Sequence, residues 1–134
     1  MGTGMTTILL DSHVVHWWSA EPERISPDAA TAIAAADELA VADISWYELA
    51  WLARHDRIAL GMPLASWLRQ LATQIRTIPL SPEIASTAVN LPSSFPGDPA
   101  DRLIFATAVD RGWLLVTKDR RLRRHRHPKH LTVW

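Results

Sequence analysis

Short apolar runs alternate along the chain with longer stretches in which apolar residues recur every three or four positions. A run of about four or five apolar residues is typical of a buried strand, and the longer periodic stretches are typical of helices packed on one face. Pro79 has no N–H to donate to a neighbouring strand, so the run that contains it is expected at an edge of the sheet. The predicted strands are residues 7–11, 39–42, 76–80, 113–117 and 131–134.

Start and stop signals delimit the helices between these runs. Ser26 is a good N-cap, and Pro27 suits the first position of a helix because its missing N–H would be unbonded there in any case. Asp98 and Pro99 repeat this pattern, and Gly112 is suited to the C-cap of the helix that they open. The predicted helices are residues 26–38, 45–55, 63–74, 81–90 and 98–111.

Strands separated by helices of this length favour parallel β-α-β units, because a parallel neighbour needs a long crossover connection. The predicted fold class is therefore α/β, with a central, mostly parallel sheet in a three-layer α/β/α sandwich. No repeat or linker interrupts the pattern, so residues 1–134 are expected to form a single domain, with residues 1–4 read as a tag remnant or an alternative start.

Composition narrows the class of protein. A chain of 134 residues with 48% hydrophobic and 21% charged residues is typical of a globular domain and excludes intrinsic disorder. The absence of cysteine excludes disulfide scaffolds, thiolate zinc sites and cysteine nucleophiles, and it fits a reducing compartment. No apolar run approaches the roughly 18 residues of a membrane span, and no secretory signal is visible. A cytoplasmic protein is expected.

The net charge of zero hides an asymmetry. Residues 1–50 carry eight acids and one base, whereas residues 101–134 carry nine bases and three acids. Most of the excess lies in the run 118–129. Lysine and arginine that contact phosphates release counterions and so gain affinity, which makes this run a candidate surface for a polyanion such as RNA. A plain solvated face is the alternative interpretation.

Four acids follow strand ends or open helices, and each has a structural explanation. Asp11 can cap the helix after the first strand. Glu48 stands three residues after Ser45, which is a capping-box pattern. Asp101 lies in the first turn of its helix, where an acid matches the helix dipole, and Asp119 can be a turn residue.

Together the four acids indicate a site. The carboxyl ends of parallel strands and the helix starts that follow them meet at one edge of a sheet. Four carboxylates gathered there would repel one another and raise one another's pKa values, which a divalent cation would relieve. An all-oxygen ligand set suits Mg²⁺ or Mn²⁺, and such an ion can polarise a phosphodiester and lower the pKa of an attacking water.

Four segments carry a resemblance to a known family, in order along the chain: residues 9–13 (Leu-Leu-Asp-Ser-His), 44–50 (Ile-Ser-Trp-Tyr-Glu-Leu-Ala), 95–108 and 115–119 (Leu-Val-Thr-Lys-Asp). They resemble the signature segments of PIN domains, most closely the VapC-type toxins of toxin–antitoxin pairs. The resemblance implies a metal-dependent endoribonuclease that is inhibited by a cognate antitoxin and forms a homodimer. It also implies cleavage that leaves a 5′-phosphate and a 3′-hydroxyl.

The resemblance also implies roles for individual residues. Asp11, Glu48, Asp101 and Asp119 match the metal-binding quartet, with Asp11 and Asp101 holding the first ion. Asp98 matches an acid outside the quartet that supports it or caps the helix, and the Thr117 hydroxyl can bond a carboxylate or a phosphate. Arg102 is expected to pair with one of the acids. The residues expected to follow the RNA backbone are Lys118, Arg120, Arg121, Arg123 and Arg124.

Apolar positions in the helices 45–55 and 63–74 offer a surface for the antitoxin. Two interpretations from other classes stay open at this point. One is a phosphoacceptor receiver domain, although the sequence lacks the acidic pair that such a domain needs after its first strand. The other is an RNA-binding module without catalytic activity.

Overall fold

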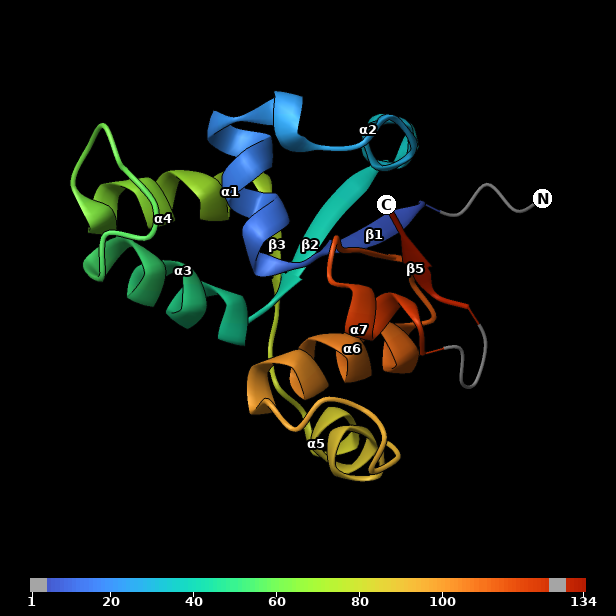
Figure 1. Cartoon of the computed structure of the whole chain (residues 1–134). Coiled ribbons are helices and arrows are strands. Elements are labelled where there is room, and N and C mark those ends of the chain that lie inside the picture. The colour runs from blue at the N-terminus through green and yellow to red at the C-terminus, as the bar shows by residue number, and fades with distance from the viewer. Residues whose placement is uncertain (1–4, 126–129) are drawn as a thin grey trace.

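The computed structural model describes residues 5–125 and 130–134 (Figure 1). Residues 1–4, and residues 126–129 of the basic run, lie outside the described residues. Five strands form one sheet in the order β3-β2-β1-β4-β5, and every neighbouring pair is parallel. The strands are β1 (Thr7–Leu10), β2 (Glu38–Ala42), β3 (Arg76–Ile78), β4 (Leu115–Val116) and β5 (Thr132–Val133).

The predicted fold class is confirmed, and β3 is an edge strand, as Pro79 indicates. Strand β4 is shorter than predicted at both ends. The N–H of Trp113 donates to the carbonyl of Ala108 and closes the preceding helix, so Trp113 belongs to the turn. Thr117, predicted as the last residue of this strand, lies just beyond β4, although its N–H still donates to the carbonyl of Val133 in β5.

Helices cover both faces of the sheet (Figure 1). One face packs against α1 (Ser12–Ala20), α2 (Pro27–Ala35), α3 (Ile44–Arg54) and α4 (Leu64–Gln74). The other packs against α5 (Pro82–Val89), α6 (Pro99–Arg111) and the short helix α7 (Arg120–Arg123). A single 3-10 turn at Pro22–Arg24 connects α1 to α2.

The strands supply both cores by alternation. Ile8 and Leu10 point into the core beneath α1 to α4, whereas Leu9 between them points toward α5 and α6. In β4, Val116 points into the core beneath α1 to α4, and Leu115 points toward α5 and α6. Successive side chains of a strand face opposite sides, so a sheet covered on both faces needs continuous apolar runs. This requirement explains the apolar runs in the sequence.

Most predicted helix ends are confirmed. The Ser26 hydroxyl accepts from the N–H of Ala29 at the start of α2, and Gly112, with φ 69°, ends α6 in the left-handed conformation. The capping box at Ser45 is wrong: α3 begins at Ile44, and its N-cap residue, Asp43, makes no capping bond with its side chain. The Asp43 carboxylate instead accepts from the N–H of Leu80 and ties α3 to the chain after β3. Within the described part of the chain, no helix is long and apolar enough to cross a membrane.

Candidate active site

The predicted acids meet at the carboxyl edge of the sheet. Asp11 directly follows β1, Asp119 follows β4, and Glu48 lies on α3, the helix after β2. Asp98 and Asp101 come from the start of α6. All five line one pocket of about 500 Å³, together with His13, Val14, Trp17, Lys118 and Arg121. The topology therefore brings together residues that are spread over 109 positions of the chain, from 11 to 119.

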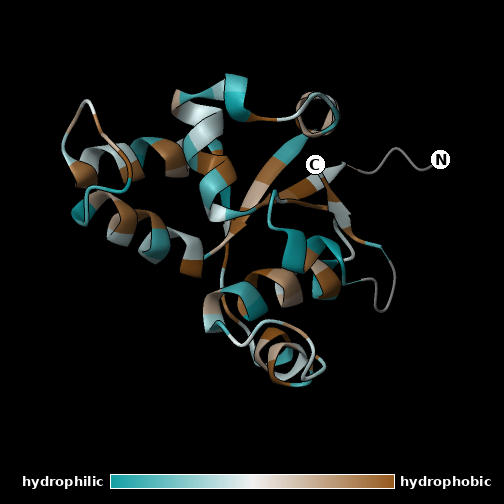
Figure 2. Ribbon diagram, viewed as in Figure 1, coloured by the Kyte–Doolittle hydropathy of each residue, from teal (hydrophilic) through white to brown (hydrophobic). Residues whose placement is uncertain are grey.

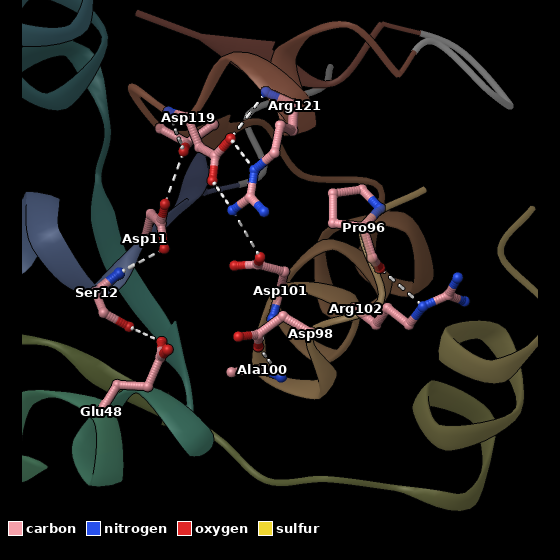
Figure 3. Close-up of polar contacts among 11 residues, drawn as sticks. Asp11, Ser12, Glu48, Pro96, Asp98, Ala100, Asp101, Arg102, Asp119 and Arg121 are labelled. Atoms are coloured by element: carbon pink, nitrogen blue, oxygen red, sulfur yellow. Dashed lines mark hydrogen bonds and ion pairs between the residues drawn. The ribbon is translucent and has the colours of Figure 1, made fainter. Parts of the chain in front are cut away.

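Two hydrogen bonds hold the Asp11 carboxylate (Figure 3). The N–H of Ser12 donates to one oxygen at 2.8 Å, and the Thr117 hydroxyl donates to the other at 2.7 Å. The same Thr117 oxygen accepts from the N–H of Asp119 at 3.1 Å. Thr117 is fully buried, so it fixes Asp11 and Asp119 relative to each other.

Glu48 is held by a pair of serines that the sequence analysis missed. The Ser12 hydroxyl donates to the Glu48 carboxylate at 2.6 Å, and it lies 3.0 Å from the Ser45 hydroxyl. Both serines are buried. The signal in the sequence was the position of Ser12 next to Asp11, together with Ser45 one helical turn before Glu48. Only the packing of α1 against α3 brings the two serines together.

Arg121 lies among the acids, an arrangement that the sequence analysis did not predict; its expected contact with RNA stays a prediction. Its guanidinium donates to Asp119 at 2.8 Å and to Asp101 at 3.1 Å (Figure 3). Asp119 also caps α7 by accepting from the N–H of Arg121 at 2.8 Å. Arg121 is close in sequence to Asp119, so the cap and the ion pair form locally, and its side chain reaches across the pocket to α6.

Arg102 pairs with no acid among the described residues, so the expected ion pair is wrong. Its guanidinium donates to five backbone carbonyls at 2.9 to 3.3 Å. These carbonyls belong to Ala88, Leu91, Pro92, Phe95 and Pro96, in the end of α5 and the loop before α6. Arg102 points away from the pocket and holds the loop that leads to Asp98 and Asp101 (Figure 3).

The pocket disfavours negative charge on most of its acids. Burial raises the pKa of Asp11, and hydrogen bonds from Thr117 and Ser12 oppose that rise only in part. Burial also raises the pKa of Glu48, with a contribution from the nearby Asp11. The pKa of Asp101 reaches about 7, because burial, Asp98 and Asp11 all disfavour its ionised form.

Asp119 behaves in the opposite way. Burial alone would raise its pKa, but the bonds from the side chain and the N–H of Arg121 outweigh burial and lower it. Arg121 therefore compensates Asp119 fully but Asp101 only in part, and the pKa values of Asp11, Glu48 and Asp101 stay raised. Groups that crowd in this way mark functional sites more often than structural ones.

The donor set fits a hard divalent cation. The five acids supply carboxylate oxygens only, which are the ligands that Mg²⁺ and Mn²⁺ prefer. Among residues 5–125 and 130–134, however, no three His, Asp or Glu side chains are arranged to hold one ion. Each carboxylate of the quartet has a hydrogen-bond partner instead: Ser12, Thr117 or Arg121. Chemistry and charge therefore suit the ion, whereas the ligand geometry is not preassembled.

The basic residues of the described part of the run line two different cavities. Arg121 and Lys118 line the acidic pocket, and the Lys118 ammonium lies 5.8 Å from the centre of the Trp17 ring. Arg120, Arg123 and Arg124 line a different groove on the other side of α7.

Comparison with known proteins defines the class. The model of the PIN domain matches residues 8–128, and the chain belongs to this family. The chain is 68% identical over 130 residues to Ribonuclease VapC22 of Mycobacterium tuberculosis (strain ATCC 25618 / H37Rv). The match covers 97% of this chain and 100% of that relative. Membership of the PIN family excludes the receiver-domain interpretation.

Solved structures share the fold at low sequence identity. VapBC2 from Rickettsia felis bound to a DNA fragment from its promoter is similar with a TM-score of 0.70 and 17% identity, covering 96% of this chain and 99% of that one. A toxin–antitoxin complex from Klebsiella pneumoniae has a TM-score of 0.63 and 23% identity, covering 84% and 86%. VapBC-1 from nontypeable Haemophilus influenzae has a TM-score of 0.64 and 14% identity, covering 85% and 87%.

Proposed function

We propose that this protein is an endoribonuclease that uses Mg²⁺ or Mn²⁺ to hydrolyse phosphodiester bonds of RNA, and that it is the toxin of a toxin–antitoxin pair. The observation that carries the proposal is the acidic pocket, in which burial and the neighbouring carboxylates of Asp98 and Asp11 raise the pKa of Asp101 to about 7. The identity of 68% with a protein named a ribonuclease supports the same activity. We expect it to act in the cytoplasm.

The quartet would hold the ion. Asp11 and Asp101 would bind the first ion, and Glu48 and Asp119 would complete its site or hold a second one. The bound ion would polarise the phosphate, lower the pKa of an attacking water and neutralise charge on the leaving oxygen. Attack of this water on phosphorus, with the bond to the 3′-oxygen breaking, would leave a 5′-phosphate and a 3′-hydroxyl.

The chain's own residues orient these ligands. Thr117 and the N–H of Ser12 fix Asp11, and the Ser12 hydroxyl fixes Glu48. Asp98 caps α6 by accepting from the N–H groups of Ala100 and Asp101, so its role is to hold the turn that presents Asp101. Because Arg121 occupies carboxylate oxygens of Asp101 and Asp119, an ion that binds these oxygens would displace Arg121. Its guanidinium is then available to a phosphate of the substrate.

An antitoxin and a second copy of the chain are the expected protein partners. An apolar groove opens beside Glu48 and Asp98, and its walls include Ile44, Tyr47 and Trp51. Tyr47 is 67% exposed and Trp51 42% exposed, which is unusual for aromatic side chains on a helix. The apolar face of α4 is less available, because Trp67 and Leu71 are buried in the core. We therefore assign protein contacts mainly to α3.

The decisive experiment is cleavage of total RNA by purified protein with Mg²⁺ or with EDTA. We expect discrete cleavage that requires the metal and that falls by at least about a hundredfold in Asp101→Asn. Asp110→Asn is the matched control, because Asp110 lies exposed near the other end of α6. Its cleavage should equal that of the wild type.

Equal cleavage by Asp101→Asn and the wild type would place the activity elsewhere and contradict the proposal. RNA that is bound but not cleaved at any metal concentration would favour the binding module without catalytic activity. The control variant separates both outcomes from a general effect of removing an acid.

A further inference from the structure

The short helix α7 separates two cavities of opposite charge. On one side lies the acidic pocket, toward which Arg121 points. On the other lies a groove of similar size between α7, β5 and α2. Both helices contact β5. Helix α7 is almost entirely hydrophilic in Figure 2, which fits a helix exposed on both sides and buried only through Leu122.

Cations dominate this second groove. Arg120, Arg123 and Arg124 line it together with His130, and Asp28 is the one acid among the described residues of the lining. None of the three arginines forms an ion pair with any described residue. Three uncompensated arginines around one concave surface create a local positive potential that attracts a polyanion.

Some of the other arginines are paired. Arg24 and Arg76 pair with Glu21 and Glu38, and Arg102 is satisfied by carbonyls. Arginines without an ion pair to a described residue also occur singly on α3, α4 and α6. Three of them come together in this groove, beside the acidic pocket.

An aromatic pair joins the two cavities. Trp17 lines the acidic pocket, and Trp134 lines the basic groove. Their ring centres are 5.6 Å apart with an interplanar angle of 56°. Trp17 is also flanked by cations, with the Arg24 guanidinium 5.2 Å and the Lys118 ammonium 5.8 Å from its ring centre. A strand that leaves the acidic pocket on this side therefore meets aromatic surface first and then the arginines.

We propose that the groove lined by Arg120, Arg123, Arg124, His130 and Trp134 binds the single-stranded RNA that flanks the scissile phosphate. The inference rests on the proposed ribonuclease function and deepens it by defining the substrate as an RNA with a single-stranded extension on one side of the cut. The arginines hold successive phosphates, and the partly exposed Trp134 offers a face on which a base can stack. Arrays of cations next to aromatic side chains are the usual surface for single strands, because every base has a face that can stack.

The test measures binding in the Asp101→Asn background, so that cleavage does not disturb it. Oligoribonucleotides of about 4 to 16 nucleotides carry a fluorescent label, and their anisotropy reports affinity. The groove variant is Arg120→Gln with Arg124→Gln. The control is Arg54→Gln with Arg69→Gln, two exposed arginines on α3 and α4 that change the net charge equally.

The groove variant should bind the longest RNA about tenfold more weakly than the control, and the gain in affinity with RNA length should disappear. The slope of log affinity against log salt should decrease by roughly 1.4, since each phosphate contact in a single strand contributes about 0.7. RNA with 4-thiouridine away from the cut should cross-link to the peptide that carries residues 130–134.

Equal affinities of the groove and control variants would overturn the proposal, as would cross-links confined to the acidic pocket. Tighter binding of double-stranded DNA than of RNA through the same arginines would reassign the groove to DNA and overturn it too. Absence of cleavage by the wild type would contradict only the proposed function, because this comparison measures binding without turnover.

Discussion

Arg102 and Arg121 occupy neighbouring regions of the molecule and have different roles, one in holding a loop and the other in balancing the charge of the acidic pocket. Arg102 lies in a cage of five neutral carbonyls, where its charge is satisfied without an acid. Arg121, with 59% of its side chain exposed, bridges Asp101 and Asp119 at the edge of the acidic pocket. The cage uses an arginine to close a loop, whereas the pocket uses one to balance charge that a cation can balance equally well.

The partners of each arginine show the role of its charge. The five carbonyls are neutral and bind Arg102 inside the fold, so we expect these hydrogen bonds to persist as long as the protein is folded. Carboxylates with raised pKa values gain from any stronger cation, so the bond of Arg121 to Asp101 is exchangeable. Four experiments test this difference, in order of the expected effect on free energy.

The largest effect should come from the carbonyl cage. Arg102→Met removes the donors of several charge-assisted hydrogen bonds and leaves carbonyls unsatisfied, so the free energy of unfolding should fall by about 3 kcal/mol. Arg121→Met should lower it by less than about 1 kcal/mol, because exposed ion pairs contribute little. Urea denaturation of both variants makes the comparison. Equal losses would show that the two arginines have the same structural role.

The next effect concerns the free energy that it costs to ionise Asp101 among buried, neighbouring acids in the folded protein. The unfolded chain ionises Asp101 near its ordinary pKa of 3.8, but the folded protein does so only near 7. Its ionisation therefore costs nothing below about pH 4, costs progressively more as the pH rises, and reaches its full cost above about pH 7.

Asp101→Asn should consequently be more stable than the wild type by about 2 kcal/mol near pH 8 without divalent metal, once solvent screening is allowed for. The gain should vanish below about pH 4. Urea denaturation across this range measures it, with Asp110→Asn as the control that should show no gain. A difference in stability that does not change with pH would rule out crowding as its cause.

Exchange of Arg121 for a metal ion is the third test. Arg121 and Mg²⁺ compete for oxygens of Asp101 and Asp119, so Arg121→Gln should bind Mg²⁺ about tenfold more tightly, which corresponds to about 1.4 kcal/mol. Calorimetric titration measures the affinity. Arg120→Gln removes the same charge from the opposite side of α7 and should change the affinity by less than about twofold. Weaker binding in Arg121→Gln than in Arg120→Gln would mean that Arg121 assists the ion.

The smallest effect should come from the serine that holds Glu48. Ser12→Ala removes the donor to the Glu48 carboxylate, and cleavage should slow about fivefold, or about 1 kcal/mol, as Glu48 loses its fixed position. Ser19→Ala is the control on the same helix, because the only hydrogen bond of the Ser19 hydroxyl to a described residue goes to the carbonyl of His16. Cleavage of RNA at saturating Mg²⁺ compares the two. If both variants cleave at the wild-type rate, Ser12 does not position the pocket.

Much of the fold was predictable because its signals are local. Continuous apolar runs indicated strands buried on both faces, and Ser26, Pro27 and Gly112 indicated helix ends that the structure confirms. The convergence of Asp11, Glu48, Asp101 and Asp119 on one pocket followed from the same reasoning, since parallel topology brings strand ends to one edge. Period and capping depend on neighbours a few residues away, and the sequence alone determines them.

Only the tertiary structure decided which partner each polar side chain takes. Ser45 looks like a helix cap in the sequence but contacts Ser12, 33 residues away. The carbonyl partners of Arg102 and the bond of Arg121 to Asp101 were not predicted for the same reason, because these partners come from other parts of the fold. A side chain with several donors can form its hydrogen bonds with residues near in sequence or far from it. Which bonds form depends on the acceptors that packing places within about 3 Å. The local sequence pattern therefore determined the α/β fold and the sheet edge at which the acids meet. Three-dimensional packing decided which ion pairs a metal ion can replace.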